Sequence, residues 1–392
     1  MEQNEKRTRR LSPFQKNRRL QGKYLSLLLI GTVFLFLVLG IVIKDRTFSE
    51  SENRNLAQAP ELSVQTLTDG SFLKDLSDYT ADQFPARDFW MSLNLRFQQL
   101  LGQKEAGGVY LGDDHYLMQI PSAPNEVQLE RNLQAISDFG QRHRDLNTVV
   151  SIVPNAVTIH SDKLPDNAPV RDQLADLQNI RSSLRNVTFR DVTENMTAHS
   201  TEELFYRTDH HWTSLGAYRA FEVIAPSLGI QAPSWDSYDR YVVSTTFEGT
   251  LSSKSGSHAV RDRVEICVPY SNIEYYVTYP ENQNGICSMY HRPALDAKDH
   301  YTVFFGGNYS RVDITTSADT ERNLLLFKDS YANCMVQYLY PYFDHIVMID
   351  PRYYYDNAEN VIRSEGITDV LFLYNLDTFQ SDSSLADVLV TP

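Results

Sequence analysis

The sequence predicts an α/β protein that follows a single membrane-spanning helix. Three observations lead to this expectation: an uncharged apolar run near the N-terminus, apolar strand-like runs that alternate with helical patterns, and a stretch of antiparallel β patterns between them. Strands that alternate with helices pair in parallel through right-handed crossovers. We therefore expect one α/β/α core that carries a β-rich insertion.

The N-terminal segment predicts a membrane anchor. Residues 1–23 form a basic leader with eight Lys and Arg against two Glu, and residues 24–43 follow without a charge. Twenty apolar residues in a helix are about enough to cross a hydrocarbon core of about 30 Å. The positive-inside bias places the leader in the cytoplasm and the chain after Lys44 outside. A cleaved signal peptide has a shorter apolar core and a small-residue cleavage site. We therefore expect a single-pass protein of the cell membrane with its bulk extracellular.

The charge balance after the anchor excludes some ligand classes. Residues 1–44 hold nine of the 36 Lys and Arg and two of the 50 Asp and Glu, which leaves 27 against 48 and a formal net charge of −21. Nucleic acids and anionic lipids are attracted to basic surfaces. The composition therefore argues against both as ligands of the extracellular part.

The three cysteines do not form a recognisable framework. Cys267, Cys287 and Cys334 have no CxxC or Cys/His finger spacing, which argues against a structural zinc site. Outside the cell a Cys267–Cys287 disulfide would close a short loop, but the spacing does not establish the geometry, and the pairing stays open. Cys334 begins an apolar run and is expected to be a buried free thiol.

The chain after the span divides into an arm and one large domain. Residues 44–63 are polar and are expected to form a linker or an extended arm, and residues 64–392 form the extracytoplasmic domain. Within residues 82–102, apolar side chains recur at helical spacing from Phe89 to Leu101, which predicts a helix.

Short apolar runs predict the strands of the domain. Runs of this kind are typical of strands buried on both faces of a sheet, and they occur at residues 147–154, 186–192, 323–330, 345–350 and 368–375. Helical patterns separate the last three. From about residue 233 to residue 300, Gly/Ser turns separate runs that favour antiparallel strands, at residues 240–257, 263–270 and 274–280. We expect this stretch to be a β-rich insertion over one rim of the sheet.

The stretch "TDHHW" combines residue types that serve in proton transfer. Asp209, His210 and His211 lie on a loop directly before a helix that Thr213 is expected to cap. Alternate side chains of an extended loop point to the same side, so Asp209 and His211 share a face. The carboxylate can then accept the Nδ1–H bond and leave Nε2 free as a base. We expect His211 to be the base, Asp209 to orient it, and His210 to brace the loop.

The candidate nucleophile is Ser330, in "LLLFKDSYAN". It follows an apolar strand at the turn into a helix, and ligands of open parallel sheets bind outside the carboxyl ends of the strands. A helix N-terminus behind the serine supplies amides for an oxyanion. A serine at such a turn also serves as an ordinary helix cap. Its coexistence with Asp209 and His211 favours the catalytic interpretation.

"TDHHW" followed by "KDSYAN" resembles the bacterial DHHW protein family. That family is similar to the alginate O-acetylation proteins, whose fold is a permuted SGNH-hydrolase-like domain. Further matching blocks extend the resemblance over about residues 48–376, in the order "FSESENRNLA", "DQFPARDFW", "GVYLGDDHYL", "GTLSSKSG", "FFGGNYS" and "IDPRYY". The implied fold is a three-layer α/β/α SGNH-hydrolase-like domain in permuted order, with Asp and His ahead of Ser.

The resemblance also implies roles for individual residues. Asp209, His211 and Ser330 match the catalytic Asp-x-His and serine, and Asn375 resembles the asparagine that joins the serine amide in the oxyanion hole. One departure is Lys328, which stands where the usual Gly-Asp-Ser block has glycine. This departure leaves the tightness of the turn open.

The implied function is an O-acetyltransferase or esterase that acts on cell-surface polysaccharide through a Ser-His-Asp mechanism. A multi-pass membrane O-acyltransferase is the partner that the family analogy implies, because an acetyl donor outside the membrane must be exported. The alternative is an inactive glycan-binding or scaffold protein of the cell envelope, which Lys328 favours slightly. A metal site on Asp209, His210 and His211 is disfavoured, because adjacent histidines project in different directions and no HExxH-like spacing exists. We therefore expect neither a metal nor a cofactor.

Overall fold

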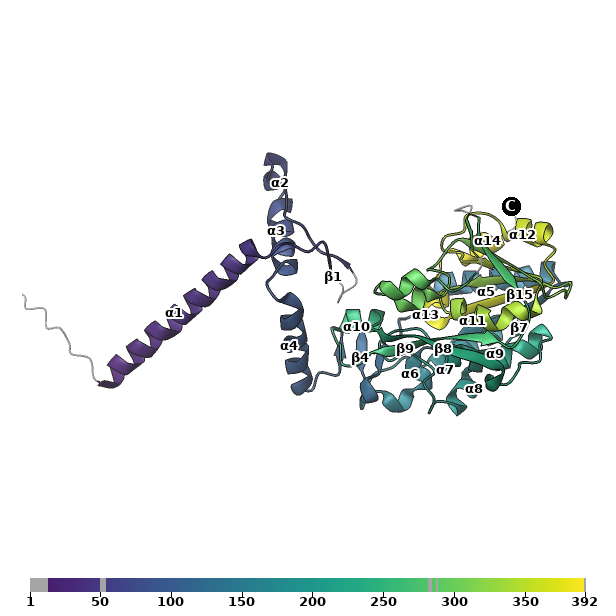
Figure 1. Cartoon of the computed structure of the whole chain (residues 1–392), viewed down its shortest axis with the longest axis horizontal. Helices are drawn as coiled ribbons and strands as arrows, with labels where there is room; N and C mark the ends of the chain where they lie inside the picture. Colours follow the sequence, from purple (N-terminus) through teal and green to yellow (C-terminus); the bar gives the residue numbers. More distant parts are fainter. Residues whose placement is uncertain (1–12, 50–53, 281–283, 287, 391–392) are drawn as a thin grey trace, which may run out of the picture. The chain divides into compact units, whose positions relative to one another are not determined.

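The computed structural model describes residues 13–49, 54–280, 284–286 and 288–390 (Figure 1). The chain folds as two units, Met1–Asn94 and Leu95–Pro392. The boundaries expected from the sequence, at residue 44 for the arm, residue 64 for the domain and residues 233–300 for the insertion, stay predictions.

The first unit contains the apolar helix. Helix α1 spans Pro13–Val42, and its part Asn17–Val42 is long and apolar enough to cross a membrane. The remaining elements are the short strand pair β1 (Phe48–Ser49) and β2 (Arg54–Asn55) and the helices α2 (Val64–Thr68) and α3 (Ser71–Asp82). Helix α4 (Arg87–Leu100) begins in this unit and ends in the second. Helix α4 lies within the expected range 82–102, and it begins two residues after Pro85.

The second unit is built on a mixed sheet of eight strands. Its order is β11 (Asn284–Ile286), β10 (Tyr275–Tyr279), β12 (Arg311–Thr316), β14 (His345–Ile349), β13 (Asn323–Lys328), β15 (Asp369–Asn375), β6 (Asn147–Val153) and β7 (Thr188–Phe189). The five strands from β14 to β7 are parallel, and β12, β10 and β11 extend the sheet in antiparallel fashion. The five parallel strands lie within the five apolar runs of the sequence.

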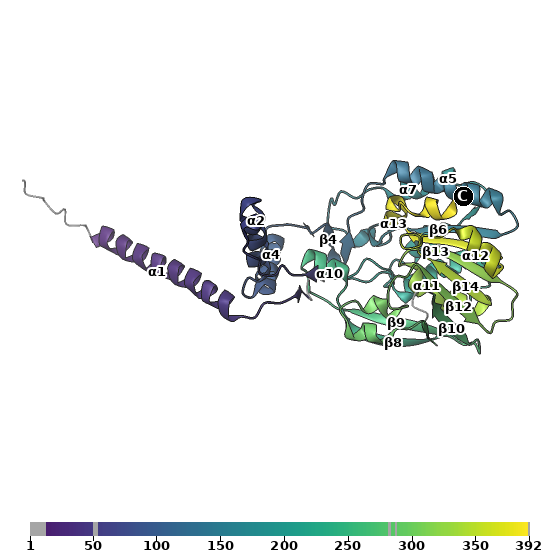
Figure 2. The same cartoon turned by 90° about the horizontal axis from the view of Figure 1, so that it is seen from above.

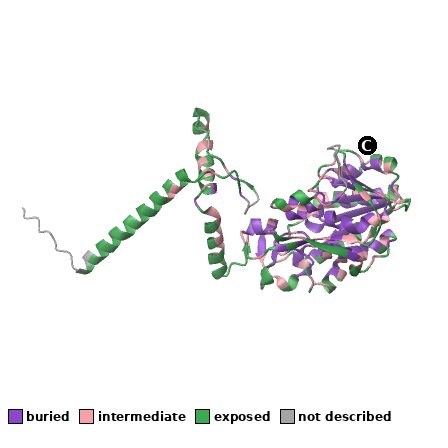
Figure 3. Cartoon of the chain, in the orientation of Figure 1, coloured by how far each residue is buried: buried purple, intermediate pink, exposed green. Residues whose placement is uncertain are grey.

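Two apolar cores lie on opposite faces of this sheet (Figures 1 and 2). Leu324 and Leu326 of β13 pack into one core, and the alternating Leu325 and Phe327 pack into the other. The second core is covered by α5 (Glu126–Arg142), α7 (Gln173–Ser183), α12 (Ala358–Glu365), α13 (Leu376–Ser381) and α14 (Leu385–Leu389), and the first by α6 (Ala156–Ile159), α8 (Thr193–Ala198), α9 (Ser214–Ile224) and α11 (Ala332–Leu339). The central strand β15 is buried along its whole length, and β13 is buried after its first residue (Figure 3). The fold is therefore a three-layer α/β/α arrangement.

The antiparallel stretch between α9 and β12 has two parts. Strands β8 (Tyr238–Phe247) and β9 (Asp262–Pro269) form a sheet of their own, whereas β10 pairs with β12 in the main sheet. Residues 250–255, expected as part of a strand and turn, are instead the helix α10 (Thr250–Ser255). It starts after Gly249 and ends at Gly256, whose φ of 73° is the left-handed conformation typical of a helix C-cap. A third small sheet holds β3 (Glu105–Ala106), β4 (Val109–Leu111) and β5 (Leu117–Gln119).

Two of the cysteines are buried free thiols, Cys267 and Cys334. Burial raises the pKa of each thiol to about 12, so both are protonated at neutral pH. Cys287, the other half of the pairing that the sequence left open, lies outside the described residues.

Candidate active site

The turn after β13 holds Ser330 at the carboxyl edge of the sheet. β13 ends at Lys328, and α11 begins at Ala332. The buried carboxylate of Asp329 accepts the Tyr331 amide at 2.9 Å and, from the end of the neighbouring strand β15, the Asn375 amide at 2.8 Å. The turn is therefore tied to the adjacent strand, which limits the positions that Ser330 can take.

The loop before α9 approaches the same edge. Phe205 and Trp212 pair as an antiparallel bridge, and Thr213 caps α9 by accepting the Gly216 amide at 3.1 Å. Trp212 is fully buried, and its indole nitrogen donates to the Tyr331 carbonyl at 2.9 Å. This hydrogen bond joins the "TDHHW" loop directly to the serine turn, although the two lie more than a hundred residues apart.

Asp209, His211 and Ser330 form one continuous hydrogen-bonded chain. His211 Nε2 lies 2.8 Å from Ser330 Oγ, and His211 Nδ1 lies 2.6 Å from Asp209 Oδ1. Asp209 is 1% exposed and His211 5%, whereas Ser330 is half-buried. The order of carboxylate, imidazole and hydroxyl is the geometry in which a histidine can take a proton from a serine.

Thr250 supports the carboxylate from the other side. Its amide and its hydroxyl donate to Asp209 Oδ2 at 2.7 and 2.9 Å, and His210 Nδ1 lies 2.8 Å from the same hydroxyl. Burial by itself raises the pKa of the Asp209 carboxyl. The two imidazoles and the hydrogen bonds from His211 and Thr250 outweigh burial and hold this pKa well below its ordinary value. Asp209 is therefore a carboxylate that keeps the proton of His211 on Nδ1 and leaves Nε2 as an acceptor.

The β8–β9 region also holds this loop in place. Asp262 accepts the amides of Arg207 and Thr208 at 2.9 and 2.8 Å and the Thr208 hydroxyl at 2.6 Å. A Cβ added to Gly249 would lie 2.2 Å from the Cβ of Asp209, so only glycine fits there without displacing the loop. The antiparallel region thus supports the position of Asp209.

Tyr301 is a neighbour of the site that the sequence did not reveal. It lies in a short 3-10 helix (His300–Val303), and its ring stacks on the His211 imidazole with centroids 3.7 Å apart at 11°. Its hydroxyl donates to the Ser330 carbonyl at 2.8 Å. Thr250 was also missed, although it lies in the block "GTLSSKSG". Neither residue has a local pattern that links it to residues 209–211, because the link arises only when the chain folds.

The structure places Asn375 at the same edge but engages its side chain elsewhere. The Nδ2 group donates to the Val153 carbonyl at 3.3 Å and to Asn155 Oδ1 at 3.1 Å, and Oδ1 accepts the Asp377 amide at 3.1 Å. Among the hydrogen bonds of the described residues, none joins this side chain to Ser330. Within the described residues, the Ser330 amide donates no hydrogen bond, so this amide is available to a ligand.

Lys328 is accommodated as a buried strand residue. Its side chain is 1% exposed, with Nζ 3.2 Å from Asn308 Oδ1 and 3.8 Å from Asp350 Oδ2. The Asp350 carboxylate also accepts two hydrogen bonds from the Arg352 guanidinium. Burial lowers the pKa of Lys328 to about 8. Because Lys328 continues the extended strand, the turn that follows does not need a glycine at this position.

Asp209, His210 and His211 also offer three possible ligand atoms for a metal within 4.8 Å of one another. The hydrogen bonds of these side chains compete with that use. Both nitrogens of His211 and both oxygens of Asp209 already face protein partners, and a metal would have to replace several of these bonds. The donor set therefore fits a proton relay better than a metal site.

Comparisons with known proteins agree on the fold. The chain is 26% identical over 181 residues to the "Probable alginate O-acetylase AlgJ" of Pseudomonas putida, a match that covers 43% of this chain and 46% of that protein. The chain spans about half the length of the curated relatives it matches. A DHHW family protein from Eubacterium siraeum superposes with a TM-score of 0.64 at 23% identity, covering 74% of this chain and 98% of that one. Bacillus cereus PatB1, solved with a sulfonyl adduct, gives 0.59 at 20% identity, covering 70% and 98%.

These structural likenesses show a shared SGNH-like α/β/α fold. The sequence profile described as "DHHW protein" matches residues 104–349, which is well over half of the chain and includes the Asp209–His211 loop and Ser330. The chain therefore belongs to the DHHW protein family.

Proposed function

We propose that this protein is an O-acyltransferase that moves acetyl groups on cell-surface polysaccharide through Ser330, His211 and Asp209. The observation that carries the proposal is the unbroken chain of short contacts, 2.6 Å from Asp209 to His211 and 2.8 Å from His211 to Ser330. Ser330 is half-buried rather than sealed, which is compatible with the approach of an ester. An ordinary helix cap would not need a buried carboxylate and imidazole aligned behind the serine.

The geometry suits acyl transfer in two steps. Ser330 Oγ attacks the carbonyl carbon of an acyl donor while its proton moves to His211 Nε2, and the Asp209 carboxylate stabilises the imidazolium. The tetrahedral intermediate collapses, the donor's oxygen leaves with the proton from His211, and an acyl-serine remains. A sugar hydroxyl then gives its proton to His211 and attacks this ester, and the bond to Ser330 Oγ breaks as His211 returns the proton to that oxygen. Water in place of the sugar makes the same site an esterase.

The negative oxygen of the intermediate needs hydrogen-bond donors. The Ser330 amide is the first candidate, because it has no acceptor in the described part of the chain and lies at the N-terminal end of α11. Asn375 is the second donor that the sequence predicted. Because its Nδ2 group already donates to Val153 and Asn155, Asn375 would serve only after releasing one of these partners.

The substrate class and the location follow from other observations. Relatives named as probable alginate O-acetylases support a polysaccharide acceptor. The apolar helix α1 behind a basic leader supports a single-pass anchor in the cell membrane, with the leader in the cytoplasm and the domain outside. An acyl donor must then cross the membrane, for which we propose a multi-pass membrane O-acyltransferase as partner.

A covalent serine probe tests the mechanism directly. We expect a fluorophosphonate to label the full chain in detergent, and Ser330→Ala to abolish the labelling without changing the melting temperature. Release of acetate from an acetylated oligosaccharide, with and without an acceptor glycan, then separates transfer from hydrolysis. A folded protein that neither labels nor turns over any acetyl ester would be the glycan-binding or scaffold protein instead.

A further inference from the structure

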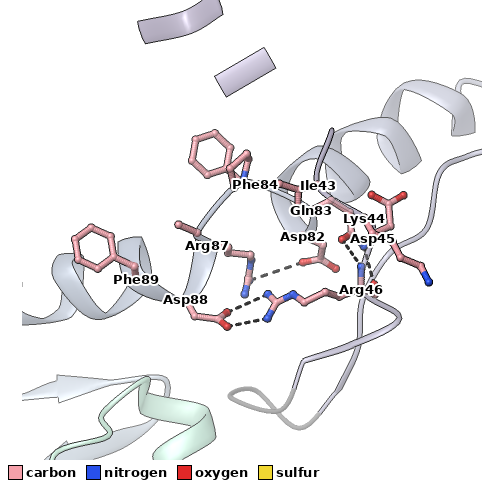
Figure 4. A pocket seen from close by; sticks show the side chains of 12 residues that line it. Ile43, Lys44, Asp45, Arg46, Asp82, Gln83, Phe84, Arg87, Asp88 and Phe89 are labelled. Atoms are coloured by element: carbon pink, nitrogen blue, oxygen red, sulfur yellow. Dashed lines mark hydrogen bonds and ion pairs between the residues drawn. The ribbon is translucent and has the colours of Figure 1, made fainter. Parts of the chain in front are cut away.

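A polar clamp fixes the exit of α1 to the start of α4. The Arg46 amide donates to Gln83 Oε1 at 3.0 Å, and Gln83 Nε2 donates back to the Arg46 carbonyl at 2.9 Å. The Arg46 guanidinium donates to both carboxylate oxygens of Asp88 at 2.9 and 3.3 Å (Figure 4). In addition, the Tyr79 hydroxyl donates to Asp45 at 2.9 Å. These contacts hold the turn between α3 and α4 against the end of the apolar helix.

An aromatic cluster lies on the α1 side of this clamp. The Phe84 ring stacks on Phe36 of α1 with centroids 5.1 Å apart, and Trp90 of α4 meets the same ring edge-on at 6.0 Å. Phe36 lies six residues before Val42, which is about 9 Å along the helix at 1.5 Å per residue. The cluster is nevertheless open to the surroundings, since Phe84 is 42% exposed and Trp90 41%.

A groove of about 510 Å³ runs between α1 and the segment from Tyr79 to Pro85. Its lining is mostly apolar and includes Val33, Phe36, Leu37, Ile41, Phe84 and Pro85. Exposed apolar surface of this kind is unfavourable in water. The groove opens beside the apolar helix, so the apolar surface of α1 is continuous with the lining of the groove.

We infer that the turn between α3 and α4 is immersed in the outer leaflet of the membrane, where a phospholipid acyl chain fills the groove. The inference rests on the proposed membrane-spanning role of α1. If α1 spans the bilayer, Phe36 lies inside the hydrocarbon region, and the rings of Phe84 and Trp90 that touch it lie at the same depth or just above it. The clamp then lies at the level of the headgroups.

The chemistry of the two layers agrees with a zwitterionic phospholipid. Arg46 is paired with Asp88, and Arg54 and Arg87 share Asp82, so each of these three arginines has an acidic partner within the polar layer. Tryptophan prefers the boundary between hydrocarbon and headgroups, where Trp90 would lie. Contact with the membrane at this turn would hold the start of α4 at the bilayer surface. The segment that connects α1 to the second unit would then be less free to move.

Tryptophan fluorescence can test the depth of this turn. The chain has three tryptophans, Trp90, Trp212 and Trp235, and α1 contains none. We would place the full chain in phosphatidylcholine vesicles whose acyl chains carry bromine, a short-range quencher, either near the headgroup or near the chain end. We expect the bromines near the headgroup to quench part of the emission, and Trp90→Phe to remove that quenched part. Trp235→Phe is the matched control and should leave it unchanged.

Each alternative has its own outcome. Equal quenching in the wild type and in Trp90→Phe, with the protein still embedded after carbonate extraction, would overturn the inference and leave the anchor intact. Extraction of the wild type by carbonate would overturn the inference together with the anchor. If a second copy of the chain covered the turn, quenching of Trp90 would fall as the protein-to-lipid ratio rises, which would also overturn it. None of these measurements depends on acyl transfer, so an inactive enzyme would not affect the result.

Discussion

His210 and His211 are adjacent in the chain and have different partners in the structure. His211 connects Asp209 to Ser330, whereas His210 faces the Thr250 hydroxyl, with the two rings 3.9 Å apart. Burial and the neighbouring His211 lower the pKa of His210, so His210 is neutral at neutral pH. Residue type alone does not distinguish the two imidazoles, but the hydrogen-bond partners do.

We expect His211→Ala and His210→Ala to differ in kind. Loss of the base that activates a serine should lower esterase turnover by about 10³-fold or more, with little change in melting temperature. Loss of His210 removes one hydrogen bond to Thr250, which should cost about 1 kcal/mol of stability and reduce turnover much less. Turnover and melting temperature of both variants decide between the roles. Abolished turnover in a folded His210→Ala protein, with His211→Ala active, would reverse the assignment.

Lys328 predicts a pH dependence of stability. Its pKa is about 8 in the folded chain against 10.5 ordinarily, because burial disfavours the charged form. Between these values the unfolded chain binds a proton that the folded chain does not, so stability rises with pH. Below pH 8 both states are protonated, and above pH 10.5 neither is, so the contribution is flat outside this window.

Comparison with Lys328→Met isolates this contribution, because other titrating groups are common to both proteins. The wild type should gain up to about 3 kcal/mol relative to the variant as the pH rises from 8 to 10.5, at about 1.4 kcal/mol per pH unit. Thermal unfolding at several pH values measures the gap in melting temperature. A gap that stays constant over this window would show that Lys328 is not held in a low-dielectric site.

At the scale of elements, the candidate site depends on how α10 and β9 meet the loop before α9. Thr250 at the first turn of α10 holds Asp209, and Asp262 at the start of β9 holds Thr208. These contacts explain why the β8–β9 region lies beside the loop before α9. Gly249, directly before α10, also lies so near the loop that an added Cβ would be 2.2 Å from the Cβ of Asp209.

We expect Gly249→Ala to disturb the site more than the fold. Its Cβ would lie 2.2 Å from the Asp209 side chain, so either α10 or the loop must move, at a cost of about 1–3 kcal/mol. The displaced carboxylate should lower turnover at least about tenfold, since each 1.4 kcal/mol lost in the transition state is a factor of ten. Gly256→Ala, at the other end of α10, is the matched control.

In that control nothing lies within 4 Å of the added Cβ, although φ is 73°. Gly256→Ala should therefore cost about 1 kcal/mol of stability through backbone strain and leave turnover unchanged. Denaturant unfolding and ester hydrolysis compare the two variants. Normal turnover in Gly249→Ala would mean that the close approach to Asp209 is not needed for activity.

At the scale of the whole molecule, the proposed anchor determines which compartment the site faces. Protease added to intact protoplasts should degrade the second unit and spare an N-terminal tag, because the basic leader favours the cytoplasmic side. Immunoblots for the tag and for the C-terminus measure this. Permeabilised cells provide the control, in which the tag is also degraded. A C-terminus that is protected in intact protoplasts would contradict the proposed topology.

Local patterns in the sequence were enough for the apolar helix, the five parallel strands and the candidate residues. The strands could be predicted because both faces of a parallel sheet are covered by helices, so each strand is a continuous apolar run. Residues 250–255 could not, because their short helix is defined by Gly249, Gly256 and contacts with a distant loop rather than by periodicity. The sequence also did not show that β10 pairs with β12 in the main sheet, because strand pairing depends on contacts between residues far apart in the chain.

For the candidate site, residue order alone showed which residue types are present and predicted that Asp209 and His211 share one side of a loop. The tertiary structure alone decided that Ser330 meets His211, that Tyr301 stacks on it, and that Thr250 and Asp262 hold the loop. It also decided that the side chain of Asn375 faces Val153 and Asn155. The physical reason is that hydrogen bonds and ring contacts between distant segments depend on distances of a few ångström, which are set by the packing of the sheet and its helices and leave no periodic trace in the chain.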